Sequence, residues 1–324
     1  MIWSRIMTAT LETRGSPPEA ASGPLVWLPF DPAPLEPLPP GLRVVVGDPS
    51  VTVPDELAEV EFLVVEAPGR APLNELIPRM PKLRVVQTTS AGVEGLAQEL
   101  PDGITLCNGK GIHDAATAEL AVTLTLAAQR DLPAFQQRQI AGTWAPTMAP
   151  GLAGKRVMIL GHGSVGEAVE ARLSGFEADV IRVARTARDG VAGVAELDDL
   201  LPAADVVIVA VPLTSRTCGM VDGAFLARMK AGALLVNVAR GPVAVTDDLV
   251  AACAAGRIRV ALDVTDPEPL PAGHPLWRTP NVLITPHVGG LSQAMAPRIH
   301  RFLREQLGRL AAGLPLANVV HGEY

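Results

Sequence analysis

Aromatic residues are scarce in this sequence, whose 324 residues include four Trp, one Tyr and six Phe, or 3% of the chain. So few rings argue against a carbohydrate- or nucleic-acid-binding surface built from stacked aromatic side chains. The net charge of −7 creates no global field that would attract nucleic acid or an anionic membrane. We therefore expect neither nucleic acid nor a membrane surface among the partners.

Long apolar runs and cysteine pairs are also missing. The longest apolar stretch, around Leu120–Ala128, is interrupted by Thr123 and Thr125, falls short of the roughly 18 residues of a membrane span, and predicts a buried helix. The N-terminal segment has no apolar core, so a secretory signal is not expected. The cysteines are odd in number and lack metal-ligand spacing, which favours reduced thiols in a cytoplasmic protein and no metal site. They are Cys107, Cys218 and Cys253.

The abundant residues are small and aliphatic: 48% of the chain is hydrophobic, with 30 Gly and 30 Pro as turn-formers. This composition is typical of many short, closely packed elements, as in α/β proteins, and the length predicts two domains. The first part of the chain predicts short aliphatic strands at Leu25–Leu28, Leu42–Val46, Glu61–Val65, Leu83–Thr88 and Ile104–Cys107.

A long apolar helix is predicted next, at Ala115–Arg130, followed by a loop that contains Gly142 and Pro146. From Gly154 onward strands and helices alternate regularly. The predicted strands are Arg156–Leu160, Asp179–Ala184, Asp205–Val211, Ala233–Val238, Ile258–Val264 and Val282–Thr285. The predicted helices between them are Ser164–Leu173, Asp222–Met229 and Thr246–Ala255. This alternation predicts a doubly wound parallel sheet.

A glycine motif follows the first strand of this alternating region and opens its helix. It has the G-x-G-x-x-G spacing of a dinucleotide fingerprint and comprises Gly161, His162, Gly163, Ser164, Val165 and Gly166. The first glycine permits the tight turn, the second lets the backbone approach a pyrophosphate, and the third lets the helix pack on the strand. We expect the side chain of His162 to point outward. The alternative is a glycine-rich turn without a ligand.

Residues at the end of the next strand should determine whether the adenosine ribose carries a 2′-hydroxyl, as in NAD, or a 2′-phosphate, as in NADP. An NAD site usually has a carboxylate there, but the sequence has none until Asp189. Arg185, Thr186 and Arg188 would instead accept a 2′-phosphate. NADP(H) is therefore favoured over NAD(H), which stays possible. The alternative is that these arginines are merely solvated.

Three further motifs, Val236–Gly241, Ala261–Leu270 and Thr285–Gly290, carry Arg, Glu and His in that order. Together with the fingerprint, this series resembles the D-isomer-specific 2-hydroxyacid dehydrogenases, which include glyoxylate/hydroxypyruvate reductases and D-3-phosphoglycerate dehydrogenases. The resemblance covers roughly residues 83–320 and is strongest over 154–290.

The resemblance implies a role for each of the three residues. Arg240 would bind the substrate carboxylate with its guanidinium fork, and His287 would be the acid/base at the carbonyl oxygen. Glu268 would orient the histidine and raise its pKa. Formate dehydrogenases of the same superfamily pair the histidine with Gln, so Glu268 argues against that branch.

Other positions resemble binding residues of the family. The loop of Ser90, Ala91, Gly92 and Val93 would bind the substrate carboxylate through backbone N–H groups, unless it is a simple turn. Further cofactor contacts are implied for Val211, Pro212, Thr217, Val238, Ala239, Asp263 and His287. Asn108 and Glu119 would be structural, and Trp144 would serve packing. Arg70 would meet a second acidic group or remain solvated.

Residues 1–22 lack periodicity and are predicted to form a loose extension. The resemblance implies the rest of the domain plan. A smaller flavodoxin-like substrate domain comprises 23–114 plus 296–324, and a Rossmann-type dinucleotide-binding domain, 115–295, is inserted in it. Family members commonly dimerise through the helix at the start of the cofactor domain, so a homodimer through Ala115–Arg130 is expected.

The leading hypothesis is an NADPH-linked reductase of a small 2-oxo acid such as glyoxylate or hydroxypyruvate, which gives the D-2-hydroxy acid where the product is chiral. One alternative is an NAD-dependent D-3-phosphoglycerate-type dehydrogenase. Another is a non-catalytic dinucleotide-binding sensor, against which the presence of Arg240, Glu268 and His287 argues.

Overall fold

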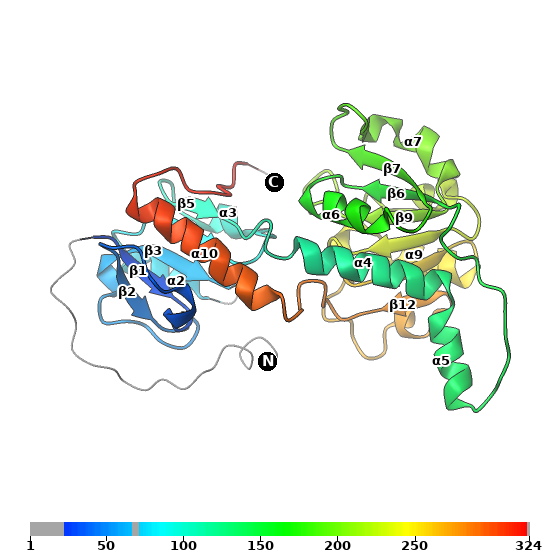
Figure 1. Cartoon of the computed structure of the whole chain (residues 1–324), viewed down its shortest axis with the longest axis horizontal. Helices are drawn as coiled ribbons and strands as arrows, with labels where there is room; N and C mark the ends of the chain where they lie inside the picture. Colours follow the sequence, from blue (N-terminus) through cyan, green and yellow to red (C-terminus); the bar gives the residue numbers. More distant parts are fainter. Residues whose placement is uncertain (1–22, 67–70, 323–324) are drawn as a thin grey trace. The chain divides into compact units, whose positions relative to one another are not determined.

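The computed structural model describes residues 23–66 and 71–322. The chain forms two compact units, Met1–His113 with Ala294–Tyr324, and Asp114–Gln293 (Figure 1). Their boundaries lie one and two residues from the predicted ones. The predicted extension 1–22 and Arg70 lie outside the described residues.

The first unit is built on a five-stranded parallel sheet with the order β2-β1-β3-β4-β5, which is the flavodoxin-like order. Its strands are β1 (Leu25–Leu28), β2 (Arg43–Val46), β3 (Val60–Val65), β4 (Val85–Thr88) and β5 (Thr105–Cys107). Its α-helices are α2 (Leu73–Leu76), α3 (Leu96–Glu99) and α10 (Met295–Ala311), and its 3-10 turns are Ala33–Leu35, Leu57–Glu59 and Ile77–Arg79.

Helix α10 returns to this unit from the far end of the sequence and lies across its sheet (Figure 1). Gln306 on the helix donates from Nε2 to Oε1 of Gln87 on β4 over 2.7 Å, and both side chains are buried. Arg304 donates to the backbone carbonyls of Pro34 and Leu35. A buried polar pair and a guanidinium clamp therefore fix the C-terminal helix to the N-terminal sheet.

The second unit is built on a seven-stranded parallel sheet with the order β12-β11-β10-β9-β6-β7-β8. Its strands are β6 (Arg156–Leu160), β7 (Asp179–Ala184), β8 (Ala192–Gly193), β9 (Val206–Val209), β10 (Leu234–Asn237), β11 (Arg259–Leu262) and β12 (Val282–Ile284). Its α-helices are α4 (Asp114–Gln129), α5 (Leu132–Ile140), α6 (Ser164–Leu173), α7 (Leu197–Leu200), α8 (Gly223–Arg228) and α9 (Thr246–Ala254), with 3-10 turns at Val194–Glu196, Leu201–Ala203, Gly241–Val243 and Pro275–Trp277. The strand order reverses between β6 and β9, which is where doubly wound sheets bind ligands.

Both faces of the second sheet are buried, because alternate strand residues enter different hydrophobic clusters. Val206 and Ile208 of β9 pack into the cluster that contains α4 and α6, which lie side by side (Figure 1). Val207 and Val209 pack into the opposite cluster with α8 and α9. Such continuous burial explains why the central strand β9 is an uninterrupted aliphatic run in the sequence.

The segment after α4 corrects one prediction. A loop was expected there, but Leu132–Ile140 forms the helix α5. Asp131 adopts a left-handed conformation with φ of 51°, which ends α4 and redirects the chain. Pro133 follows within the first turn of α5, where its missing N–H costs no hydrogen bond. None of the helices in the described part of the chain has the length and apolar character of a membrane span.

Candidate active site

The candidate site residues of the second unit follow the carboxyl ends of its parallel strands. The fingerprint follows β6, Arg240 follows β10, Asp263 follows β11, and His287 follows β12. Parallel strands place their carboxyl ends at one edge of the sheet, so these residues share an edge.

Glu268 and His287 form a close pair at this edge. His287 Nδ1 lies 2.5 Å from Glu268 Oε1, and both side chains are partly exposed. The segment just before Glu268 is held in place, because Thr265 Oγ1 donates to the carbonyl of Pro267 and Thr246 Oγ1 donates to the carbonyl of Asp266. Since Nδ1 is used by the carboxylate, Nε2 is the ring nitrogen left to meet a substrate.

The His287 loop is held by one buried carboxylate. His287 has a left-handed backbone with φ of 50°, and its N–H donates to the carbonyl of Asp263. Asp263 Oδ1 accepts from Val288 N and from Thr285 Oγ1, and Oδ2 accepts from Gly289 N at 2.8 Å. Asp263 is 2% exposed, so these bonds satisfy a carboxylate that would otherwise be costly to bury. The sequence did not assign this supporting role to Asp263 or to Thr285.

The pair is electrostatically coupled. The hydrogen bond to Glu268 raises the pKa of His287 above its usual value, against partial burial and the nearby positive charge of Arg240. The same hydrogen bond lowers the pKa of Glu268, with a smaller contribution from Arg240. The arrangement therefore favours an ionised carboxylate that holds a protonated imidazole, which is a poised general acid.

Arg240 extends from a turn with a fixed backbone. Buried Asn237 brackets this turn, accepting from Ala239 N at Oδ1 and donating from Nδ2 to the carbonyl of Arg240. Arg240 Nη1 donates to the carbonyl of Ala239 at 2.7 Å. Gly241 is required next, because a Cβ there would lie 1.9 Å from the carbonyl oxygen of Thr265. This close approach brings the Arg240 turn against the loop that carries Glu268.

The glycine fingerprint has the geometry of a phosphate cradle. Gly161 has φ of +107°, and a Cβ on it would lie 2.5 Å from the backbone of Ala210, beside Val211 at the end of β9. A Cβ on Gly166 would lie 2.3 Å from the carbonyl oxygen of Gly161. A Cβ on Gly163 would meet no atom within 4 Å. The middle glycine therefore faces open space at the N-terminus of α6, and this cradle fits a dinucleotide pyrophosphate.

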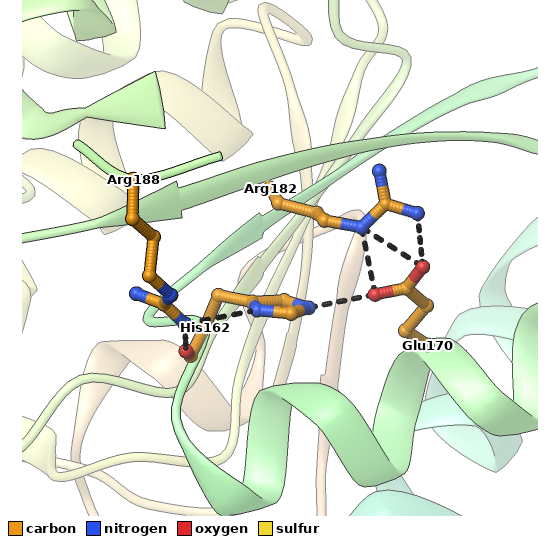
Figure 2. Close-up of polar contacts among 4 residues, drawn as sticks. All are labelled: His162, Glu170, Arg182 and Arg188. Atoms are coloured by element: carbon orange, nitrogen blue, oxygen red, sulfur yellow. Dashed lines mark hydrogen bonds and ion pairs between the residues drawn. The ribbon is translucent and has the colours of Figure 1, made fainter. Parts of the chain in front are cut away.

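The side chain of His162 does not point outward as predicted. It is 8% exposed, and Nε2 lies 2.7 Å from Glu170 Oε2 on α6 (Figure 2). Arg188, in the segment between β7 and β8, donates from Nη2 to the carbonyl of His162 at 2.6 Å. The outward prediction was wrong because the partners of His162 come from later elements and cannot be read from the motif.

The other expected cofactor residues occupy neighbouring turns. Arg185 and Thr186 are exposed just after β7. Thr217 Oγ1 donates to the carbonyl of Pro212 at 2.6 Å and so closes the turn that follows β9. Val238 donates its N–H to the carbonyl of Val209 at the end of β9. These contacts fix the backbone that follows β9 and β10 at the carboxyl edge of the second sheet, and none of them involves the fingerprint.

The expected carboxylate-binding loop, Ser90–Val93, belongs to the first unit. Its carbonyls are tied back: Ser90 O accepts from Thr88 Oγ1 and Gly109 N, and Ala91 O accepts from Asn108 Nδ2. Asn108, expected to be structural, thus anchors this loop. Among the described residues, no acceptor takes the N–H groups of Ala91, Gly92 or Val93. The loop is suited to bind an anion.

The structure thus brings Arg240, Asp263, Glu268 and His287 together in the second unit, while Ser90–Val93 stands in the first. Within residues 23–66 and 71–322, no group of His, Cys, Asp or Glu side chains could hold a metal ion. The chemistry at the edge is that of a cation, a carboxylate and an imidazole beside a dinucleotide cradle. Fold and site together define a dinucleotide-dependent dehydrogenase.

Comparisons with known proteins identify the family. Residues 122–289 match the model described as D-isomer specific 2-hydroxyacid dehydrogenase, NAD binding domain. The chain is 35% identical over 253 residues to the human glyoxylate reductase/hydroxypyruvate reductase, which covers 73% of this chain and 74% of that protein. It is 30% identical over 277 residues to a D-3-phosphoglycerate dehydrogenase of Archaeoglobus fulgidus, covering 82% of this chain but 52% of that protein. The chain therefore spans about half the length of that relative.

A solved structure gives the same result. The NADPH-dependent glyoxylate/hydroxypyruvate reductase of Sinorhizobium meliloti, in complex with NADP and sulfate, superposes with a TM-score of 0.79 at 27% identity, covering 92% of this chain and 98% of that one. The chain belongs to the D-isomer-specific 2-hydroxyacid dehydrogenase family, whose members are NAD(P)-dependent oxidoreductases.

Proposed function

We propose that this protein reduces a small 2-oxo acid, of the size of glyoxylate or hydroxypyruvate, to the 2-hydroxy acid, with D configuration where the product is chiral. The observation that carries the proposal is the 2.5 Å contact between His287 Nδ1 and Glu268 Oε1 beside Arg240. This set provides a proton for the carbonyl oxygen and a cation for the carboxylate, which are what the reduction of a 2-oxo acid requires.

The chain's residues divide the work. Arg240 binds the substrate carboxylate through its guanidinium fork. A reduced nicotinamide, when bound, supplies the hydride to the carbonyl carbon. His287 transfers the proton from Nε2 to the carbonyl oxygen, so that the carbonyl becomes a hydroxyl. Glu268 holds the ring and stabilises its protonated form before transfer, and the reverse direction returns the proton to Nε2.

NADPH is the proposed reductant, and NADH the slower alternative. Arg185, Thr186 and Arg188 stand at the end of β7, where a carboxylate would repel a 2′-phosphate, and the first acidic residue is Asp189. The solved NADP complex of the Sinorhizobium meliloti enzyme supports this choice by similarity. The dinucleotide would be held by Gly161–Gly166, with contacts from Val211, Pro212, Thr217, Val238, Ala239 and Asp263.

A panel of 2-oxo acids with NADPH and NADH, followed by absorbance of the reduced cofactor, tests this function. We expect oxidation of NADPH with glyoxylate or hydroxypyruvate, a higher kcat/KM with NADPH than with NADH, and weak turnover of phenylpyruvate, since the chain has few rings to line a pocket. Faster NAD reduction with D-3-phosphoglycerate would replace the proposal by the phosphoglycerate-type alternative. No turnover with any member would leave a dinucleotide-binding sensor.

We also propose a homodimer, with a contact that differs in place from the one expected. Helix α4 packs on α6, β10 and β11 of its own unit, so much of its apolar surface is already used. Four large exposed apolar side chains lie in the segment just beyond it, at Leu132, Ile140, Trp144 and Met148. Trp144, for which a packing role was expected, is 97% exposed. Large apolar side chains exposed on one segment suit contact with a second copy of the chain.

Sedimentation equilibrium checks this assembly. The Trp144→Ser and Met148→Ser double variant should dissociate at concentrations where the parent is dimeric. Trp277→Ser, which alters an exposed Trp elsewhere, should not. A monomeric parent protein would end the proposal.

A cytoplasmic location is the accompanying proposal. It is supported by three free cysteines, because disulfides rather than thiols are typical of oxidising compartments. Burial raises the pKa of Cys107 to about 11 and that of Cys253 to about 12, so both are poor nucleophiles at neutral pH. Fractionation of cells that express the tagged chain would locate it.

A further inference from the structure

A chain of polar contacts runs beneath the glycine fingerprint and joins residues of four segments (Figure 2). Arg182 on β7 donates from Nε to both carboxylate oxygens of Glu170 at 2.9 Å, and from Nη2 to Oε1. Glu170 on α6 faces His162 Nε2 at 2.7 Å. His162 in turn meets Arg188, whose Nη2 lies 2.6 Å from the carbonyl oxygen of His162 and 3.4 Å from its Nδ1.

The direction of these hydrogen bonds follows from the chemistry of the groups. The hydrogen bond from Arg182 lowers the pKa of Glu170, so Glu170 is an ionised carboxylate, which can only accept. The Nε2 atom of His162 must therefore carry the proton and donate. In the neutral ring Nδ1 is then an acceptor, and it faces the Arg188 guanidinium. A buried histidine side chain thus links a carboxylate to a cation.

Arg188 is fixed at both ends by this arrangement. Its N–H and carbonyl exchange hydrogen bonds with Val191 at 2.9 and 2.8 Å, which pins the backbone. Its Nη2 is engaged by His162, whereas Nε and Nη1 have no partner among the described residues. Both Arg188 and Arg185, three residues earlier, are exposed, but Arg185 makes no hydrogen bond within the described ranges. One of the two arginines is therefore preorganised, and its free N–H groups lie beside the cradle.

The charges of the cluster favour an anion. Glu170 alone would repel a phosphate near the fingerprint, but Arg182 neutralises it through its two-atom contact with the carboxylate. With a neutral His162, the four residues sum to one positive charge, which is that of Arg188. The carboxylate can therefore anchor the histidine without weakening the attraction for an anionic ligand.

We propose that His162 is a positioning residue for cofactor selectivity: anchored by Glu170, it holds Arg188 in place to bind the 2′-phosphate of an adenosine nucleotide. The inference rests on the proposed use of NADPH and adds the reason why Arg188 is effective there. A long side chain held in its binding conformation loses less conformational entropy when it meets a ligand. His162 therefore acts through Arg188 rather than on the cofactor's reacting atoms.

Calorimetric titration of the full chain with adenosine 2′,5′-bisphosphate and with 5′-AMP tests this without catalysis. His162→Ala keeps the backbone carbonyl contact of Arg188 and removes the ring contact at Nδ1, so it should weaken the bisphosphate about tenfold and leave 5′-AMP nearly unchanged. His162→Gln, whose amide can still donate to Glu170, should recover much of the loss. The double variant Glu170→Ala with Arg182→Ala, which removes the anchor from outside the fingerprint and leaves the net charge of the cluster unchanged, should reproduce the selective loss. Glu167→Ala, an exposed glutamate on the same helix, should leave the ratio of the two affinities unchanged.

A double-variant cycle separates this inference from the function on which it rests. In an Arg188→Ala background, His162→Ala should cause no further loss of bisphosphate binding, because the residue it positions is gone. If Arg188→Ala itself leaves bisphosphate binding intact, the proposed 2′-phosphate site is wrong. If Arg188→Ala weakens it but His162→Ala lowers both ligands equally, or adds its full effect in the Arg188→Ala background, His162 is only structural and the inference is overturned.

Discussion

Replacing His287 by Gln is expected to lower kcat for 2-oxo acid reduction about 10²–10⁴-fold, the usual contribution of a general acid. The dissociation constant of NADPH should change little, because the fingerprint and the end of β7 are untouched. Gln has no proton to release at neutral pH, so the developing alkoxide must take its proton from water. Steady-state kinetics and a separate fluorescence titration of NADPH measure the two quantities.

Two further variants distinguish the loss of the general acid from a disturbed conformation of the His287 loop. His287 has φ of 50°, and Asn tolerates this left-handed conformation at least as well as His does. His287→Asn should therefore remain folded and be as inactive as His287→Gln. His321→Gln, at an exposed histidine in the other unit, should retain full activity. Retention of most of the turnover in both His287 variants would refute the acid assignment.

The pH dependence of kcat/KM also tests the role of His287, because the direction of the change can be predicted. Because Glu268 raises the pKa of His287 above 6.5, the acid form persists to higher pH than in a free histidine. The kcat/KM for reduction should fall as pH rises through that pKa, while oxidation of the product, which needs the neutral ring, should rise there. Glu268→Gln removes the charge that raises the pKa of His287. The fall in reduction and the rise in oxidation should therefore both move to lower pH. An unmoved profile would mean that the pair does not control the proton.

Much of the fold could be predicted from local sequence patterns. Arg156–Leu160, Ser164–Leu173 and Asp179–Ala184 have the predicted bounds, because buried parallel strands are short aliphatic runs and a glycine turn marks the helix start. The Arg240 and His287 motifs were likewise found from their order along the chain. The pairing of His287 with Glu268 was expected from the resemblance and has its geometric support in the 2.5 Å contact.

Of the three features that were missed, one depends on local backbone conformation and two depend on residues that are distant in the sequence. Helix α5 was missed because it is separated from α4 by the left-handed backbone of Asp131. Polar residues adopt this conformation only in certain contexts, so the sequence did not indicate a break at this position. The burial of His162 depends on Glu170, Arg182 and Arg188, which are 8, 20 and 26 residues away in the sequence and meet it only in the folded sheet. The support that Asp263 gives to the His287 loop likewise joins the ends of two neighbouring strands.

Replacing Arg240 by Ala should lower kcat/KM for the 2-oxo acid by about two to three orders of magnitude. Truncating one partner of a hydrogen-bonded charge pair costs about 2–5 kcal/mol, and the substrate carboxylate would lose its fork-shaped partner. Arg240→Lys keeps the charge but not the fork, so it should recover only part of the loss. NADPH affinity should be unaffected, and kcat/KM is measured across the substrate range with saturating cofactor.

The same variant tests the electrostatic coupling from the opposite side. The positive charge of Arg240 opposes protonation of His287, so its removal should raise the pKa of the histidine and extend reduction to higher pH. We therefore expect a large loss in kcat/KM, and we expect the remaining reduction activity to decline at a higher pH than in the parent protein. Glu268→Gln should shift this decline in the opposite direction. Arg228→Ala, which removes an exposed arginine paired with Asp198 on the same unit, should change neither. If Arg240→Ala kept a kcat/KM near that of Arg228→Ala, the substrate carboxylate would have to bind elsewhere, and Ser90–Val93 would be the remaining candidate.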